Sequence, residues 1–589
     1  MPTPTIIKGE EHFFTTIYFG NGGGQRVGRF IPFTDQVTIA NSCIFNHTTN
    51  NYLSRTASSN GSATTLTFSC WVKRGSLGIA DILYNGNVST TSEHLQFDSS
   101  NRLQYYEVTS GSRKWDYVTT RTFEDTSKWY HIMVARDTTN STQADRVKIY
   151  VDGEKITAYD TQTQPALNAT GYWNQTSYGH YLGTTGSASY IRGIGYLAEV
   201  NMIDGQALLP ASFGITDTST GRWIPKTVEP FPTTTTDIAV TVVDSGGNKF
   251  ALDSVTQGTV TLIEGATYKF DQSDSSNSGH PLRFSLTSNG THGGGTEFTS
   301  GVTTVGTSGS SGAYTQITVP TGTATLYYYC SNHSGMGGTA NTQDAYGTNG
   351  FRLKFQDSSA LGDDTSGNGN DFTATNLAST DQTTDSPNSN HMTMGGRTGG
   401  SITLSEGNLK MVVNASDTCG LSGMAIPSSG KWYWEITLDT SGGYDRIGIA
   451  PNTAPLNVAP LTPGIAWNRM NTSGGMMMLG SNVSGSWGSG FSNGDIIQFA
   501  LDADNKMLYI GGNNTWRNSG VPTSGSTGTG AVAYGGTSLG NAILHPASGA
   551  GNSGSTNTHT YNFGQKNFTY TPPTGFLALQ QDNLPETDK

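Results

Sequence analysis

The chain has 589 residues, of which 76 are glycine and only 13% are charged. Its formal net charge of −12 and the lack of a basic tract argue against a nucleic-acid partner, because phosphate binding needs clustered Lys and Arg. Thr, Ser, Gly and Asn dominate, which is typical of short strands and tight turns and not of helices.

No stretch has the apolar length of a signal peptide or a membrane span, so we expect no membrane insertion. The cysteines are too far apart in sequence to suggest a disulfide framework; they are Cys43, Cys70, Cys330 and Cys419.

Residues 1–45 are expected to form an N-terminal arm. Phe19–Gln25 is glycine-rich, but no helix pattern follows it, as a phosphate-binding loop would require. We therefore expect a flexible arm that a partner orders.

Residues 46–235 read as short alternating strands. In Leu66–Lys73, alternate apolar residues predict one buried face. Lys128–Arg136, Arg146–Glu154 and Gly195–Leu209 follow, with the motifs W-x-H, I-Y-V-D-G and L-A-E-V. This order resembles laminin-G or concanavalin-like jelly rolls, which implies that fold for residues 46–235.

A catalytic site in this unit is not expected. Glu199–Asp204 is similar to the acidic strand of jelly-roll glycosidases, but Asn201 stands where those enzymes need an acid. That chemistry requires two carboxyl groups at a fixed separation. We interpret His131, inside a strand, as structural.

Residues 236–340 contain the most chemically informative run. Asp237–Val243 and Gly258–Phe270 predict strands, and Asn277–Phe284 and Thr325–Met336 follow them. This order resembles cupredoxins such as plastocyanin, which implies a Greek-key sandwich. Matched residue by residue, the resemblance implies His280, Cys330 and His333 as trigonal copper ligands and Met336 as the axial one.

This ligand set suits copper, since a thiolate, two imidazoles and a thioether form blue-copper sites. Only two residues separate His333 from Met336, fewer than in plastocyanin-like loops. If Met336 lies elsewhere, a three-ligand site remains, and zinc or iron competes. His292 is a spare candidate. The alternative is that Cys330 is simply a buried apolar residue.

Residues 341–400 are expected to be a polar connector with one laminin-G-like strand in Tyr346–Phe355, so the cupredoxin-like unit is expected to be an insertion. Asp364, Asn368 and Asp371 offer the oxygen ligands that calcium prefers, but they do not follow the EF-hand pattern. We interpret this segment as a turn and keep calcium as the alternative.

Residues 401–580 alternate as sandwich strands, and residues 581–589 form a tail. Gly430–Leu438 (G-K-W-Y-W-E) and Gly494–Asp502 (G-D-I-I-Q-F-A-L-D) resemble a SPRY domain, as does Met507–Trp516. SPRY domains bind partners through loops, and the resemblance implies no catalytic residues.

The whole is expected to be all-β, with laminin-G-like, cupredoxin-like and SPRY-like sandwiches in tandem. This combination resembles tail-fibre and other virion appendage proteins of marine tailed bacteriophages. It implies a non-enzymatic virion protein that assembles in host cytoplasm, forms a homo-oligomer, most simply a trimer, and attaches to other virion proteins through its arm. The implied function is recognition of a host-surface glycan or receptor. The alternatives are a purely structural fibre or decoration protein and a polysaccharide depolymerase.

Overall fold

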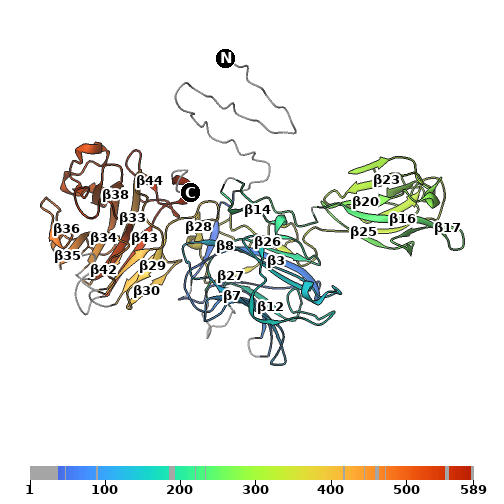
Figure 1. Ribbon diagram of the computed structural model, residues 1–589, viewed down its shortest axis with the longest axis horizontal. Coiled ribbons are helices and arrows are strands. Elements are labelled where there is room, and N and C mark those ends of the chain that lie inside the picture. The colour runs from blue at the N-terminus through green and yellow to red at the C-terminus, as the bar shows by residue number, and fades with distance from the viewer. Residues whose placement is uncertain are drawn as a thin grey trace, which may run out of the picture.

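The computed structural model describes residues 38–584, apart from residues 47, 88–89, 185–192, 219, 233, 415–417, 443–444, 458–462, 471–472 and 551–555. These residues form three β-sandwiches that lie in a row (Figure 1), which confirms the expected all-β fold. Most of the N-terminal arm and of the tail falls outside the described residues. Within the described part of the chain, no helix is long and apolar enough to cross a membrane.

Helical structure in the described residues is limited to short 3-10 turns. They are η1 (Gln143–Asp145), η2 (Pro210–Ser212), η3 (Ser275–Asn277), η4 (Gly290–Gly293), η5 (Ser379–Asp381), η6 (Arg517–Ser519), η7 (Pro522–Thr527) and η8 (Gln581–Asn583).

The first sandwich lies in the middle of the row and has two eight-stranded sheets. Its first sheet has the order β10 (Glu154–Lys155), β9 (Val147–Val151), β8 (Trp129–Asp137), β3 (Thr65–Arg74), β13 (Gly195–Asp204), β1 (Ser42–Phe45) and β28 (Gln382–Thr383), and β26 (Phe351–Leu353) also pairs with β13. Its second sheet has the order β11 (Tyr159–Thr163), β7 (Ser112–Thr122), β6 (Arg102–Thr109), β5 (Thr91–Phe97), β4 (Ala80–Asn87), β12 (Gly179–Leu182), β2 (Tyr52–Thr56) and β27 (Thr373–Thr375). A hairpin of β14 (Gly214–Thr216) and β15 (Trp223–Pro225) lies beside it.

Strand β3 shows why this sequence forms a sandwich. Leu66, Phe68, Cys70 and Val72 are fully buried in the core between the two sheets, as their alternation predicts. Trp71 points to the other face, yet it is also buried, because the C-terminal sandwich covers that face. The strand is therefore apolar on the side of its own core, and on its otherwise polar outer face Trp71 contacts the neighbouring sandwich.

The segment after residue 341 differs from the expected connector. Strands β26, β27 and β28 pair with β13, β2 and β1, so residues 351–383 complete the first sandwich. Strand β1, expected at the end of the arm, is also part of the first sandwich and pairs with β13 in its first sheet. Strand β26 is the one expected within Tyr346–Phe355, whereas β1, β27 and β28 are two to four residues long, too short for a period-2 pattern to identify them.

The inserted unit, residues 236–343, joins the first sandwich at two adjacent points. Gln206 Nε2 donates to the carbonyl oxygens of Pro230 at 3.0 Å and Ala345 at 2.8 Å, so the chain leaves and returns at one place. One sheet has the order β18 (Val255–Thr256), β17 (Asn248–Leu252), β16 (Thr236–Asp244), β20 (Thr267–Asp271), β23 (Tyr314–Thr318) and β22 (Val302–Val305). The other has the order β19 (Val260–Ile263), β25 (Gly338–Gln343), β24 (Leu326–Cys330) and β21 (Leu282–Ser285).

The C-terminal sandwich has a seven-stranded and a nine-stranded sheet. The first has the order β29 (Met394–Thr398), β32 (Thr418–Ser422), β42 (Leu544–Ala550), β34 (Asp445–Pro451), β35 (Ile465–Met470), β36 (Ser473–Met478) and β37 (Ser481–Asn482). The second has the order β30 (Ile402–Ser405), β31 (Lys410–Val413), β43 (Asn557–Asn562), β33 (Lys431–Thr440), β38 (Ile496–Asp502), β39 (Met507–Gly512) and β40 (Thr515–Trp516), with β41 (Val532–Ala533) on β39 and β44 (Leu577–Ala578) on β33.

The first and C-terminal sandwiches share one hydrophobic cluster. Trp71, Trp129 and Tyr196 of the first sheet belong to the same cluster as Trp432 and Trp434 of β33. Tyr196 also donates its hydroxyl to the Gly407 carbonyl oxygen at 2.6 Å. The two sandwiches are thus packed together, whereas the inserted unit has its own core.

Candidate metal centre

Two paired strands of the inserted unit bring the predicted ligands together. Leu282 of β21 lies opposite Cys330 of β24 in the antiparallel register. His280 precedes β21 by two residues, and His333 follows β24 by three residues. In an antiparallel pair, the start of one strand lies beside the end of the other. The residues just before β21 and just after β24 are therefore neighbours, and both histidines flank the cysteine.

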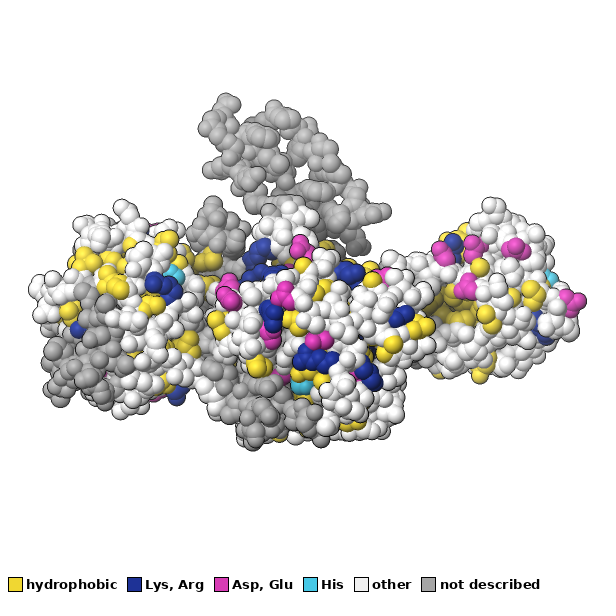
Figure 2. Space-filling view, turned by 60° about the horizontal axis from the view of Figure 1, so that its bottom comes forward, with side chains coloured by type: hydrophobic (Ala, Val, Ile, Leu, Met, Phe, Trp, Pro, Cys, Tyr) yellow, Lys and Arg dark blue, Asp and Glu magenta, His cyan; other side chains and the backbone are white. Residues whose placement is uncertain are grey.

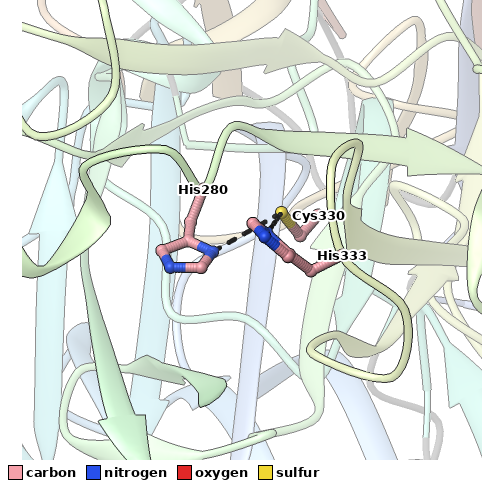
Figure 3. A group of neighbouring side chains, drawn as sticks. All are labelled: His280, Cys330 and His333. Atoms are coloured by element: carbon pink, nitrogen blue, oxygen red, sulfur yellow. Dashed lines mark hydrogen bonds between the residues drawn. The ribbon is translucent and has the colours of Figure 1, made fainter.

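The three side chains converge on one small volume (Figure 3). Cys330 Sγ lies 3.9 Å from His280 Nδ1 and 3.7 Å from His333 Nδ1, and all three ligand atoms lie within 4.8 Å of one another. Metal bonds of about 2.0 Å to nitrogen and 2.3 Å to sulfur place such atoms roughly 3.5–3.8 Å apart around one ion. The sulfur–nitrogen distances therefore fit a shared metal with little adjustment.

Each ring nitrogen of His280 has a neighbouring side chain that orients the ring. Its Nδ1 faces Cys330, and its Nε2 lies 3.3 Å from Asn248 Nδ2 of β17. An amide can donate or accept, so Asn248 can satisfy Nε2 in either tautomer. Burial, and then the facing His333, lower the pKa of His280, which favours the neutral imidazole that binds metals.

Cys330 is fully buried, and burial raises the pKa of its thiol. The backbone amides of Asn332 and His333 act in the opposite direction by hydrogen bonding to the sulfur. A metal would therefore bind with loss of the thiol proton, and the two amides would remain to stabilise the thiolate.

The loop that carries His333 is held from outside. Asn289 Oδ1 accepts from the Gly335 amide at 2.7 Å, and Asn289 Nδ2 donates to Ser334 Oγ at 2.9 Å. His333 itself is exposed, so the site opens to solvent on that side.

Met336 and His292 have different positions from the three clustered ligands. Met336 is 1% exposed and belongs to the hydrophobic core that contains Cys330. Its role as the axial ligand stays a prediction. The Nε2 atom of His292 lies 3.1 Å from the Cys330 carbonyl oxygen, and His292 is not one of the clustered ligands. The spare candidate therefore braces the ligand strand.

The calcium alternative falls on a loop whose carboxylates bind protein donors. Asp364 Oδ1 accepts from the amides of Arg352 and Ser366, both at 2.9 Å. Asp371 Oδ1 accepts from the Asp364 amide at 2.9 Å, and Asn368 Nδ2 donates to the Gly347 carbonyl oxygen at 2.7 Å. These hydrogen bonds give the polar residues a structural role, as parts of a turn that lies against β26.

The acidic strand β13 also has structural partners. Glu199 pairs with Arg352, and Asp204 Oδ1 accepts from the Ser62 amide at 2.8 Å. Asn201 Nδ2 donates to the Glu199 carbonyl oxygen at 2.8 Å. These partners support a structural role for the strand.

The sequence reasoning found the three clustered ligands but missed the residues that support them. Asn248 and Asn289 reach the site from other elements, and no local motif identifies either one. Only the fold brings them to the site.

Comparison with known proteins supports the fold of the first sandwich. Residues 47–211 match the model of a laminin G family in the concanavalin A-like lectin/glucanases superfamily. No curated protein matches the chain.

Similar solved structures share little sequence with the chain. A heptameric SAP-like pentraxin from Limulus polyphemus has 16% identity and a TM-score of 0.22, over 29% of this chain and 79% of the pentraxin. The SPRY domain of human HERC1 has 14% identity and a TM-score of 0.20, over 27% of this chain and 91% of that domain. The TRIM65 PSpry domain has 12% identity and a TM-score of 0.23, over 29% of this chain and 92% of that domain.

Proposed function

We propose that this protein is a virion appendage protein of the tail-fibre type, which recognises a host-surface glycan without chemistry. The observation that carries the proposal is an aromatic ladder on the outer face of the second sheet of the lectin-like sandwich. Five rings from neighbouring strands form it, those of Tyr52, Tyr181, Tyr84, His94 and Tyr106.

The ladder follows from cross-strand register. Tyr181 lies opposite Tyr84, Tyr84 opposite His94, and His94 opposite Tyr106. The His94 and Tyr106 rings stack at 4.5 Å, and the Arg113 guanidinium lies 4.2 Å from the Tyr106 centroid. The inner rings are buried by their neighbours, while Tyr52 and Tyr181 are only partly buried.

An amide row runs beside the ladder on the same face. Gln96 Nε2 donates to Gln104 Oε1 at 3.0 Å, and Gln104 Nε2 donates to Asp116 Oδ1 at 2.9 Å. Aromatic rings and amides supply the apolar and hydrogen-bonding contacts that saccharides use. Uncharged polar side chains and backbone also dominate the face of the molecule shown in Figure 2.

The test is an array of bacterial surface polysaccharides probed with the purified chain. We expect the chain to bind at least one polysaccharide. The double variant Tyr52→Ala/Tyr181→Ala should weaken this binding at least about tenfold, since aromatic residues that a bound partner covers often contribute most of the binding energy. Tyr314→Ala, in the inserted unit, is the matched control. Binding to no polysaccharide would favour a purely structural fibre, and release of reducing sugar would favour a depolymerase.

The proposal includes assembly as a homo-oligomer, most simply a trimer, through the arm before residue 45. Assembly would add avidity to weak individual sites. Light scattering of the full chain and of a chain lacking residues 1–37 tests this. We expect a trimer and a monomer, respectively; a monomeric full chain would contradict it.

We infer a second function, metal binding by His280, Cys330 and His333, from their convergence. A bound ion, for which copper fits the donor set best, would connect β21 to the β24 loop and so stabilise the inserted unit.

Titration with copper and with zinc, followed by visible absorption and thermal melting, tests the metal site. We expect a thiolate-to-copper band and a higher melting temperature, both lost in Cys330→Ser and kept in His292→Gln. An unchanged melting temperature with either ion would count against the site.

A further inference from the structure

A pocket of about 400 Å³ lies where three distant parts of the chain meet. The outer face of the first sheet forms one wall, the β14–β15 hairpin another, and Pro387, Asn390 and Gln581 close it from the C-terminal side. Its volume falls within the usual range for small-ligand sites, about 300–1,000 Å³. It is separate from the metal centre and from the aromatic ladder, which faces the opposite side of the first sandwich.

Three indole side chains line this junction pocket, those of Trp71, Trp129 and Trp223. Trp129 Nε1 donates to Asp385 Oδ1 at 2.9 Å, and Trp223 Nε1 donates to His131 Nδ1 at 3.1 Å. No hydrogen bond of Trp71 Nε1 to another described residue is found. This atom is also not among the buried polar atoms that lack a partner, so it is accessible from the pocket. Trp71 thus offers a free donor at the pocket.

Trp223 can reach the pocket wall because residue 153 is glycine. A Cβ at Gly153 would lie 2.5 Å from the Trp223 ring, and the φ of +81° there also disfavours any other residue. The indole is thereby packed flat against the β9–β10 turn, which fixes its orientation.

The charged residues around the pocket leave two guanidinium groups without a carboxylate partner. Lys128 pairs with Asp152 at 3.1 Å, and Glu154 is the other acid in the lining. Arg121 lies over the Phe123 ring at 4.8 Å, and Arg222 contacts Gln581 Oε1 at 3.2 Å. Neither arginine forms an ion pair within the described residues.

We propose that the junction pocket binds an acidic saccharide, namely a sugar ring that carries a carboxylate. Indole surfaces pack against the apolar faces of pyranose rings, and guanidinium groups bind carboxylates in a planar, bidentate geometry. The free Trp71 N–H adds one donor for a ring or hydroxyl oxygen. The inference deepens the proposed glycan recognition and gives it a second site of defined ligand charge.

The probes are glucuronate, galacturonate and N-acetylneuraminate, each compared with its uncharged methyl ester. Tryptophan fluorescence and calorimetric titration of the full chain measure binding. We expect at least one acid to bind about tenfold more tightly than its ester, because hydrogen bonds to charged groups are the stronger ones. Equal or absent binding of all three acids and their esters would overturn the proposal.

Two variants locate the site. Arg121→Gln/Arg222→Gln should abolish the preference for the acid, and Trp71→Phe should weaken binding while keeping the ring. Lys269→Gln, which removes one positive charge in the inserted unit, is the control. Acid binding that survives the double variant, or that Lys269→Gln removes, would overturn the assignment to this pocket. Polysaccharide binding that only the ladder variant weakens would leave the proposed function standing without this site.

Discussion

His131 shows how one buried side chain joins separate parts of the first sandwich. It lies against Trp71 at a ring distance of 4.9 Å and accepts from Trp223 Nε1 on its Nδ1. Its Nε2 must then carry the proton and donate to Ser69 Oγ at 2.8 Å. Burial lowers the pKa of His131 to about 3, so the ring stays neutral in the folded protein.

This lowered pKa predicts a loss of stability in mild acid. The unfolded chain takes up the proton near pH 6.5, whereas the folded chain does not until about pH 3. The stabilisation is therefore present above pH 6.5 and falls by up to about 1.4 kcal/mol per pH unit below it. Thermal unfolding between pH 7.5 and 5 measures the slope.

His131→Gln should make this slope shallower without removing it, because burial also lowers the pKa of His180 to about 3. Parallel curves for the variant and the unchanged chain would show that His131 does not contribute.

At the scale of an element, the strand β28 and the turn after it are fixed by one buried ion pair. Lys73 Nζ donates to Asp385 Oδ2 at 2.7 Å and to Asn390 Oδ1 and the His391 carbonyl oxygen, both at 2.8 Å. Both charged side chains are fully buried. The turn therefore holds the entry to the C-terminal sandwich against the first sheet.

Replacing Asp385 with Asn would leave the Lys73 charge buried without its partner. We expect Asp385→Asn to lower the free energy of unfolding by about 3–5 kcal/mol. Chemical denaturation followed by tryptophan fluorescence measures this value. Asp145→Asn, which breaks the partly exposed pair with Lys148, is the control and should cost less than about 1 kcal/mol. Equal effects of the two substitutions would contradict this account.

The inserted unit is separable at the scale of the whole molecule, since its two connections meet at Gln206. We expect replacement of residues 232–344 by a short Gly-Ser linker to leave the remaining two sandwiches folded. We also expect residues 236–343 alone to fold, because their core is their own. Amide exchange of the two fragments, compared with the full chain, tests both outcomes. Loss of protection in β13 of the shortened chain would show that the insertion is required.

The sequence was informative where a pattern is local. The alternation in β3 predicted its buried face, and the resemblance of the segments around His280 and Cys330 to cupredoxins implied that His280, Cys330 and His333 converge. Strands β27 and β28 lacked such a signal, because two or three residues cannot show a period, whereas β26 lies within the strand expected in Tyr346–Phe355. The junction pocket could not be predicted from the sequence either, because its lining residues are hundreds of positions apart and share no local pattern. Copper, Met336 as its axial ligand and the virion setting stay predictions.

The closure at Gln206 has a mechanical consequence. Tension between the two ends of the described chain would pass from β1 directly to β28, which pair in the first sheet, and from there into the C-terminal sandwich. The inserted unit lies off this path, as a side branch held at its base. Under a pulling force such as that of flowing liquid, the first sandwich would carry the load. The loop of the inserted unit that carries His333 would keep its conformation until the strands of the first sheet began to separate.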